Sequence, residues 1–455
     1  MTSTTKITLL VTVLAGVIFA GVSLVSCKQD NVPYDTKHLD KFHQLTTKGE
    51  ENDLTASDLS LFVDYSNCIA NGMQSAFYQK MVSPLTAATK HYWSIKGDSI
   101  TEESVSNQSV YYLLNNVQET NYAALDKAVE QMANRNGESV LLTDGELFTQ
   151  TATKNNPNNP YMHAAFKNWL LRGHDIHILA EPFKEVFNGN TFNKKRFYII
   201  FTDDRIKGNI YDRIKEIVNF EEFPQVDEFH LSGNYHGIVP SNGHNSEPNA
   251  IVAAQIQPFG LFEIQDWQVD WENIVNLIVN GYDKSGNPLP NGEKLIGGLR
   301  INKNAFGCYR IKDIDVKVTN INADYFDIYN RIEAGEKVGF TQITPSQIQK
   351  FIIIDADEFK KHGNVDLYFD INNFAPGGDL DGKPFNYFKI EIVIKDLENI
   401  LENSINMFDF DSVINPGQTN VSISESLKNC VFDPELLNKL KGKVLYTIYV
   451  KSDKY

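Results

Sequence analysis

Two aspartates stand directly after short apolar runs, at points where a buried strand would end. Asp64 follows LSLFV and precedes Ser66 by two residues, and Asp144 follows ESVLLT. The carboxyl ends of parallel strands meet at one edge of a sheet, which is where such sheets bind ligands. Thr120 precedes the clearest amphipathic helix, so its hydroxyl could cap that helix or face the same crevice. These carboxylates and hydroxyls are hard oxygen ligands of the kind that Mg²⁺ or Ca²⁺ takes.

The elements that must position these residues alternate between strand and helix. Apolar runs at LSLFV, HYWSIK, ESVLLT, DIHIL and RFYIIF are typical of buried strands. Apolar residues at helical spacing predict helices over residues 75–90, 122–133, 160–173 and 209–218. The repeated strand–helix units predict an α/β fold over residues 58–225, with a doubly wound, mainly parallel sheet and helices on both faces.

The loops quoted above resemble those of von Willebrand factor A domains. DYSNC resembles the Asp-x-Ser-x-Ser loop of that family, ETNYAALDKAVEQM resembles its threonine loop and helix, and SVLLTDGE resembles its strand ending in Thr-Asp-Gly. The resemblance covers about residues 58–225 and implies a metal-ion-dependent adhesion site, in which a carboxylate of the ligand completes the coordination of Mg²⁺ or another divalent cation. It also implies that Ser66 and Thr120 bind the ion directly, and that Asp64 and Asp144 bind it mainly through water.

Position 68 departs from the family pattern. Cys68 stands where the family has a second serine, and its soft sulfur is a poor partner for a hard cation. A water could replace the missing oxygen ligand at reduced affinity, or the site could have lost its metal, and the sequence leaves both open. For Cys68 itself we favour a buried, inert cysteine over a catalytic thiolate, because no histidine lies near it in the sequence.

The histidines do not form a recognisable metal motif. His174 and His177 lie three residues apart around a predicted strand, so their side chains should point to opposite faces. His230, His236 and His244 crowd one stretch of the chain, but their spacing matches no compact zinc pattern. We therefore expect a solvated loop there.

The second half of the chain, residues 226–455, has a different pattern. Short strand-like runs recur between Gly, Asn, Asp and Pro residues, among them DIDVKVTNI, KFIIIDA, VDLYFDI, YFKIEIVI and VLYTIYV. These runs predict a β-rich region, organised as one or two sandwiches. Only DPELLNKLKGK is expected to form a short helix.

The amino terminus indicates export. Lys6 precedes an apolar stretch that ends in small residues immediately before Cys27, which is typical of a signal peptide over residues 1–26. The length of the stretch would also permit a membrane-spanning helix.

Leu24 to Cys27 (LVSC) resembles the lipobox of bacterial lipoproteins, which implies cleavage before Cys27 and lipidation of that cysteine. Residues 27–57 then read as a flexible tether on a lipoprotein of the cell envelope and outer membrane. KQD after Cys27 resembles the signals that send lipoproteins of Bacteroidetes-type bacteria to the cell surface.

Charge and composition narrow the function. The chain has 42 basic and 58 acidic residues, which gives a net charge of −16. Because this charge repels the phosphates of nucleic acids, we do not expect the protein to bind them. We expect a non-enzymatic envelope protein that binds a protein partner through the adhesion-type site or its degenerate remnant, and contacts the membrane only through its lipid. The alternatives are a metal-dependent surface hydrolase and a structural component of an outer-membrane assembly. We disfavour the enzyme because no nucleophile–base–orienter set is apparent.

Overall fold

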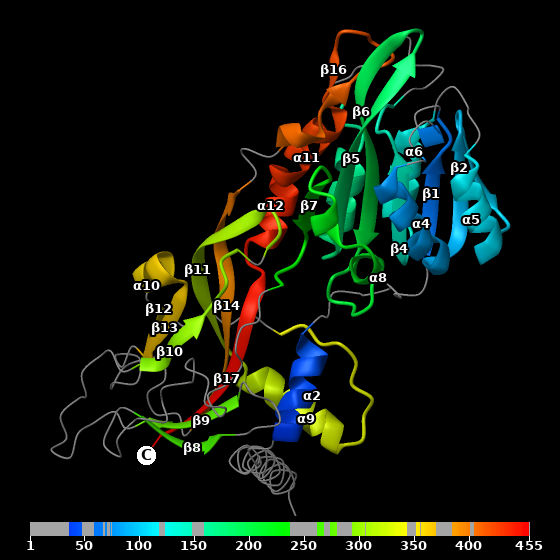
Figure 1. The fold of residues 1–455 in the computed structure, drawn as a ribbon. Helices are drawn as coiled ribbons and strands as arrows, with labels where there is room; N and C mark the ends of the chain where they lie inside the picture. The colour runs from blue at the N-terminus through cyan, green and yellow to red at the C-terminus, as the bar shows by residue number, and fades with distance from the viewer. Residues whose placement is uncertain are drawn as a thin grey trace, which may run out of the picture.

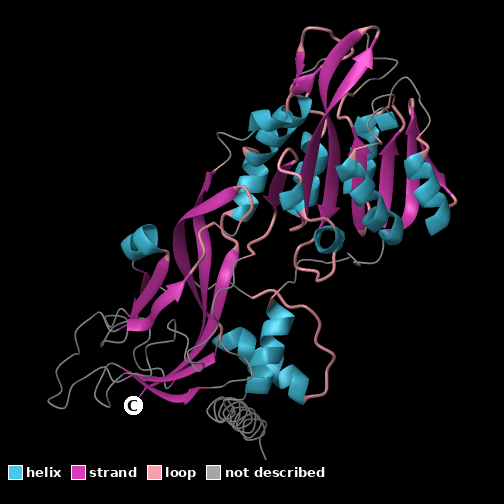
Figure 2. Ribbon diagram, in the orientation of Figure 1, coloured by secondary structure: helices cyan, strands magenta, loops and turns pink. Residues whose placement is uncertain are grey.

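The chain forms an α/β domain followed by a C-terminal region that packs against it (Figures 1 and 2). The computed structural model describes residues 36–47, 59–236, 262–267, 274–279, 294–343, 352–369, 385–400 and 405–454. Within these ranges, residues 67–68, 71–72, 74, 118–122, 148–158, 305 and 355 are not described. The signal peptide, Cys27, Cys68, Thr120 and His244 therefore lie outside the described residues.

The α/β domain is built on a seven-stranded sheet with the order β3-β2-β1-β4-β6-β5-β7. Strands β2, β1 and β4 pair in parallel, whereas β3, β6 and β7 each pair antiparallel to a neighbour. Strand β6 lies between β4 and β5, so β5 runs in the same direction as β1 without pairing with the parallel group. The strands are β1 (Leu59–Asp64), β2 (Thr89–Lys96), β3 (Ser99–Glu103), β4 (Glu138–Thr143), β5 (Asp175–Phe187), β6 (Asn190–Thr202) and β7 (Asp227–Ser232).

Helices cover both faces of this sheet. The helices α4 (Ala76–Ala88), α5 (Asn107–Asn115) and α8 (Ile210–Ile217) share a core with the β1 side chains Leu61 and Val63, and the short helix η1 (Phe220–Glu222) follows α8. On the other face, α6 (Leu125–Ala133) and α7 (His163–Leu171) pack with Phe62. The predicted α/β class is confirmed, but the sheet is mixed: β2, β1 and β4 pair in parallel, whereas the other four pairings are antiparallel, because β6 pairs between β4 and β5.

The local sequence explains these elements. Strands β1 and β4 are buried at every position, as expected of central strands with both faces covered. Helix α6 buries its apolar stripe, and α8 begins at Asn209, whose side chain accepts a hydrogen bond from the backbone N–H of Asp212. Pro84 lies inside α4 without ending it.

The C-terminal region is β-rich, as predicted. Its largest sheet has the order β11-β14-β17-β9-β8, in which only β17 and β9 pair in parallel, and a three-stranded antiparallel sheet has the order β10-β13-β12. The strands are β8 (Phe262–Trp267), β9 (Ile274–Val279), β10 (Lys294–Arg300), β11 (Tyr309–Asn320), β12 (Ile352–Ile354), β13 (Asn364–Phe369), β14 (Phe385–Asn399) and β17 (Val444–Lys454), with the short pair β15 (Phe410–Asp411) and β16 (Thr419–Asn420).

The C-terminal region contains more helices than the single one predicted. Helix α12 (Pro434–Leu440) is the predicted one, and α9 (Asn322–Glu333), α10 (Ala356–His362), α11 (Ser422–Val431) and the short helix η4 (Ile405–Phe408) are additional. Helices α11 and α12 return to the α/β domain and contact α7, where Ser426 accepts a hydrogen bond from the backbone N–H of Met162 at 3.2 Å. One hydrophobic core therefore continues from the sheet of the α/β domain into the C-terminal region.

The stretch predicted as a flexible tether contains helix α2 (Thr36–Thr46). Its Phe42 is fully buried and makes edge-on ring contacts with Tyr325 of α9 and Tyr449 of β17. Figure 1 shows α2 beside α9, at the end of the molecule opposite to the β5–β6 hairpin. Among the described residues, we find no helix with the length and apolar character that a membrane span requires.

Candidate functional site

Asp64 lies at the carboxyl end of β1, where the sequence predicted a metal ligand. Its side chain is buried, with Oδ1 accepting the backbone N–H of Ser66 at 2.8 Å and Oδ2 accepting the hydroxyl of Thr143 at 2.8 Å. Thr143 ends β4, so this bond ties together the two neighbouring strand ends. Burial, together with the nearby negative charge of Asp144, raises the pKa of Asp64 to about 7.

Asp144 follows β4 at the same edge and is paired with a lysine. The ammonium of Lys194 lies 2.9 Å from Asp144 Oδ2 and 2.5 Å from Glu146 Oε2, and the Lys194 side chain has no exposed surface. Lys194 belongs to β6, the antiparallel strand next to β4. A protein ammonium thus binds one of the two carboxylates from which the sequence predicted a divalent-metal site.

Glu146 also binds the C-terminal region. Its carboxylate accepts hydrogen bonds from the hydroxyl of Ser412 at 2.5 Å and from the backbone N–H groups of Val413 and Ile414 at 3.2 and 3.3 Å. Beside it, Gly145 adopts φ +76°, and a Cβ there would lie 2.5 Å from the Cδ1 atom of Ile423 in α11. The C-terminal segment therefore covers part of this edge of the sheet.

A further buried carboxylate lies near Lys194. Glu185 of β5 has 3% of its surface exposed, and its Oε2 atom has no hydrogen-bond partner. Burial raises the pKa of Glu185 to about 7, with the charges of Asp144 and Glu146 acting in the same direction and that of Lys194 opposing them. One ammonium thus faces a surplus of acidic groups, so the site favours additional positive charge or bound protons.

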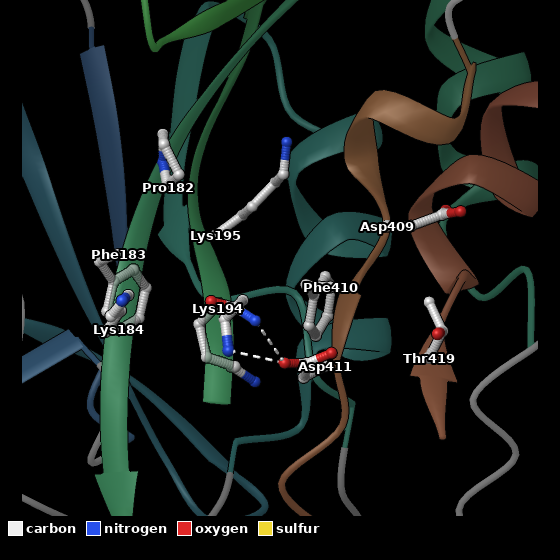
Figure 3. Close-up of a pocket in the computed structure, with 10 residues that line it drawn as sticks. Pro182, Phe183, Lys184, Lys194, Lys195, Asp409, Phe410, Asp411 and Thr419 are labelled. Atoms are coloured by element: carbon white, nitrogen blue, oxygen red, sulfur yellow. Dashed lines mark hydrogen bonds between the residues drawn. The ribbon is translucent and has the colours of Figure 1, made fainter. Parts of the chain in front are cut away.

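A pocket of about 350 Å³ opens beside this site, between the β5–β6 hairpin and the β15–β16 segment (Figure 3). Phe410 lines the pocket, and the centroid of its ring lies 4.5 Å from the Lys194 ammonium. Asp411 closes one side by accepting hydrogen bonds from the backbone and side-chain amides of Asn193, at 2.8 and 3.1 Å. The pocket is therefore formed by two segments more than 200 residues apart in the sequence.

The predicted ligand set is placed only in part. Asp64, Ser66 and Asp144 lie together at the predicted edge, as described above, whereas Thr120 and the variant position Cys68 fall outside the described residues. The metal-binding roles of Asp64, Ser66, Thr120 and Asp144 therefore stay predictions.

The opposite edge of the sheet carries a second cluster. Asp175, Asp204, His230 and His236 each offer one potential metal-binding atom, and these atoms all lie within 4.8 Å of one another. Asp175 begins β5, Asp204 follows the end of β6, and the two histidines lie in and after β7. The prediction of a solvated loop around His230 and His236 is wrong, because both imidazoles bind the buried carboxylate of Asp175.

The surroundings of this cluster orient its members. His177 Nε2 lies 3.0 and 2.9 Å from the two carboxylate oxygens of Asp204, and the backbone N–H of Asp204 donates to Asp175 Oδ2 at 2.9 Å. The ring of His177 stacks between those of Tyr211 and His230, with centroid distances of 3.5 and 4.2 Å. Burial lowers the pKa of His177, which favours a neutral ring in this stack.

His174, the other histidine near the start of β5, binds a different aspartate. Its Nδ1 lies 3.1 Å from Asp203 Oδ2, and neither side chain is exposed. His174 and His177 are thus separate, as their spacing predicted.

The second cluster was missed because its members come from three strand ends. The register of β5 with β7 places Asp175 opposite Ser232 and His177 opposite His230, although more than 50 residues separate the partners in the sequence. The register of β5 with β6 places Asp175 opposite Thr202, two residues before Asp204. The one local signal in the sequence was the closeness of His230 and His236. Their carboxylate partners, Asp175 and Asp204, lie too far away in the sequence to complete a recognisable motif.

Searches against protein-family models, curated proteins and solved structures gave no match.

The two clusters differ in chemistry as well as in position. The Asp64–Asp144 edge combines hard carboxylate oxygens with a built-in ammonium, whereas the second cluster combines carboxylates with imidazoles.

Proposed function

We propose that the chain is a non-enzymatic, lipid-anchored outer-membrane protein that binds a protein partner at the Asp64–Asp144 edge of a von Willebrand factor A-like domain. The observation that carries this proposal is the convergence of Asp64 and Asp144 from neighbouring parallel strands, with the ammonium of Lys194 between Asp144 and Glu146. Helices on both faces of the sheet support the likeness to the family.

We further propose that this edge is a degenerate adhesion-type site. A divalent cation bound as the sequence predicted would have to displace an ammonium that is fully buried and contacts two carboxylates. It would also lack the oxygen ligand that Cys68 replaces. In this proposal Lys194 supplies the positive charge, and the partner contacts the surrounding side chains without a metal ion.

The position of the amino terminus supports partner binding at this edge. Cys27, the proposed lipid attachment site, precedes Thr36 of α2 by nine residues, which reach about 30 Å at most when fully extended. Helix α2 lies at the end of the molecule opposite to the β5–β6 hairpin (Figure 1). A lipid on Cys27 would therefore hold the C-terminal region near the membrane and direct the hairpin end away from it.

Exposed apolar side chains at the hairpin end offer a contact surface. Val186 and Phe187 near the turn of the hairpin are 67% and 38% exposed, and Ile414 in the neighbouring segment is 37% exposed. The backbone of Ile414 binds Glu146, so this surface adjoins the buried Lys194 site. Aromatic and aliphatic side chains exposed together are typical of protein contact sites.

Photo-crosslinking in intact envelopes tests this proposal. A photoreactive residue would replace Phe187 in the full-length chain, and a second variant would carry it at Glu216, an exposed position on α8. We expect a discrete protein adduct from position 187 that exceeds the yield at position 216 and persists in EDTA. Equal yields at the two positions would refute a partner at the hairpin end, and loss of the adduct in EDTA that added Mg²⁺ restores would refute the metal-free mode.

A further inference from the structure

We infer that Asp175, Asp204, His230 and His236 form a binding site for a transition-metal ion of the zinc class, which clamps the ends of β5, β6 and β7. The site lies at the edge of the sheet opposite to Asp64 and Asp144, so it is independent of the partner-binding proposal.

The spacing of the donor atoms fits a tetrahedral ion. Bonds of about 2.0–2.1 Å in a tetrahedral zinc site place neighbouring ligand atoms about 3.3–3.4 Å apart. His230 Nε2 lies 3.1 Å from Asp175 Oδ1 and 3.3 Å from Asp204 Oδ2, and His236 Nε2 lies 2.7 Å from Asp175 Oδ1. Binding of the ion would open the His236–Asp175 pair by about 0.6–0.7 Å and the other two pairs by no more than about 0.3 Å.

The donor set selects the class of ion. Imidazole nitrogens suit Zn²⁺, Cu²⁺, Ni²⁺ and Fe²⁺, whereas Mg²⁺ and Ca²⁺ prefer oxygen ligands alone. Two imidazoles with two carboxylates also balance the charge of a dication when both histidines are neutral. The metal then replaces the protons that the histidines share with Asp175.

The neighbouring side chains hold the ligands in place. Metal-binding residues are commonly oriented by hydrogen bonds to their other polar atoms, and loss of such a partner weakens binding by about 10–100-fold. His177 binds both oxygens of Asp204 and stacks on the ring of His230, so one residue orients two ligands. The backbone N–H of Asp204 in turn fixes Asp175.

The site lies where the α/β domain meets the C-terminal region. A Cβ on Gly307 would lie 3.0 Å from the backbone nitrogen of Ser232 and 3.2 Å from the carbonyl oxygen of His230. The ammonium of Lys443 donates to the carbonyl oxygen of Gly233 at 2.9 Å, between the two histidines in the sequence. An ion here would therefore stiffen the strand against which the C-terminal region packs.

The number of ligands points to a structural ion. Four protein ligands fill a tetrahedral shell, whereas catalytic zinc keeps one position for water or substrate. Asp175 is fully buried, and the other three side chains are between 22% and 29% exposed. An ion can thus enter from solvent and is then held by a complete set of ligands.

Zinc titration of the full-length chain in detergent tests this inference, after a chelator has removed bound metal. We expect one Zn²⁺ per chain by equilibrium dialysis with elemental analysis. Tetrahedral Co²⁺ absorption should appear with the same stoichiometry. His236→Ala should weaken Zn²⁺ binding by at least about 100-fold, and His177→Phe, which keeps a stacking ring, by about 10–100-fold.

His362→Ala is the matched control, because His362 is an exposed histidine paired with Glu358 outside the cluster, and it should leave zinc affinity unchanged. Asp204→Asn, which is nearly isosteric, replaces His236→Ala if circular dichroism shows that the alanine variant does not fold. Zinc binding of equal affinity in the wild type and the folded cluster variant would overturn the inference. Absence of stoichiometric zinc binding by the wild type would also overturn it and leave the four side chains as a hydrogen-bonded network.

Discussion

The ammonium of Lys194 is buried away from water, and its contribution to stability depends on the carboxylates around it. Removing one partner of a buried ion pair typically costs about 3–5 kcal/mol, because the remaining charge loses its compensation. We therefore expect Lys194→Met to lower the free energy of unfolding by about that amount in urea titrations. Lys184→Met, at an exposed position of the adjacent strand, is the control and should change it little.

The same variant tests whether the ammonium takes the role of a metal. Without Lys194, the carboxylates of Asp144 and Glu146 lack their cation. Millimolar Mg²⁺ should then recover part of the lost stability in Lys194→Met and leave the midpoint of wild-type unfolding unchanged. An equal Mg²⁺ effect on both proteins would contradict the proposed replacement of the ion by Lys194.

Glu185 makes stability depend on pH. Its pKa is raised from 4.5 to about 7 by burial, so the folded chain binds a proton there more tightly than the unfolded chain does. This contribution to stability is complete below pH 4.5 and is lost as the pH rises through about 7. Glu185→Gln should therefore flatten the decline in the free energy of unfolding over this range, whereas Glu216→Gln on the exposed surface of α8 should not.

At the scale of elements, the β4 loop and α11 fit closely at Gly145. Gly145→Ala would place a methyl group against Ile423 and impose a side chain on a positive φ. Gly189→Ala is a matched control. Gly189 has a nearly identical φ of +77°, and a Cβ added there would have no non-adjacent residue within 4 Å. The positive φ costs about 1–2 kcal/mol in both variants, and overpacking should add about 1–3 kcal/mol for Gly145 alone. Equal losses of stability in urea titrations would show that α11 does not pack firmly on this loop.

The sequence predicted elements whose signal is local. Strands β1 and β4 are short apolar runs, and α6 and α7 have regular apolar spacing, so their positions followed from periodicity. The insertion of β6 between β4 and β5 has no such signal, because a hairpin can pair with the sheet through either strand. Lys194 and the His–Asp cluster depend on that insertion and on the register of β7, and they were therefore not predicted.

At the scale of the whole molecule, the continuous core couples the two regions. Leu436 of α12 is fully buried in that core, and α12 contacts α7. Leu436→Ala should lower the free energy of unfolding by about 2–5 kcal/mol, and hydrogen exchange in β1 and β4 should accelerate together with that in β17. Phe432→Ala, at a half-exposed position of the same segment, is the control. Faster exchange confined to the C-terminal region would show that the α/β domain folds independently.

The strand order β4-β6-β5 also sets the order in which the Asp64–Asp144 edge can be completed during synthesis of the chain. A chain that emerges amino end first presents β1, β2 and β4 early, but β4 gains its second neighbour only when β6 has followed. Until then Asp64 and Asp144 remain without the ammonium of Lys194, which is supplied 50 residues after Asp144. The last covering of this edge waits for Ser412 and Ile423. A nascent chain therefore keeps the Asp64–Asp144 edge hydrated until nearly all of the protein has been synthesised.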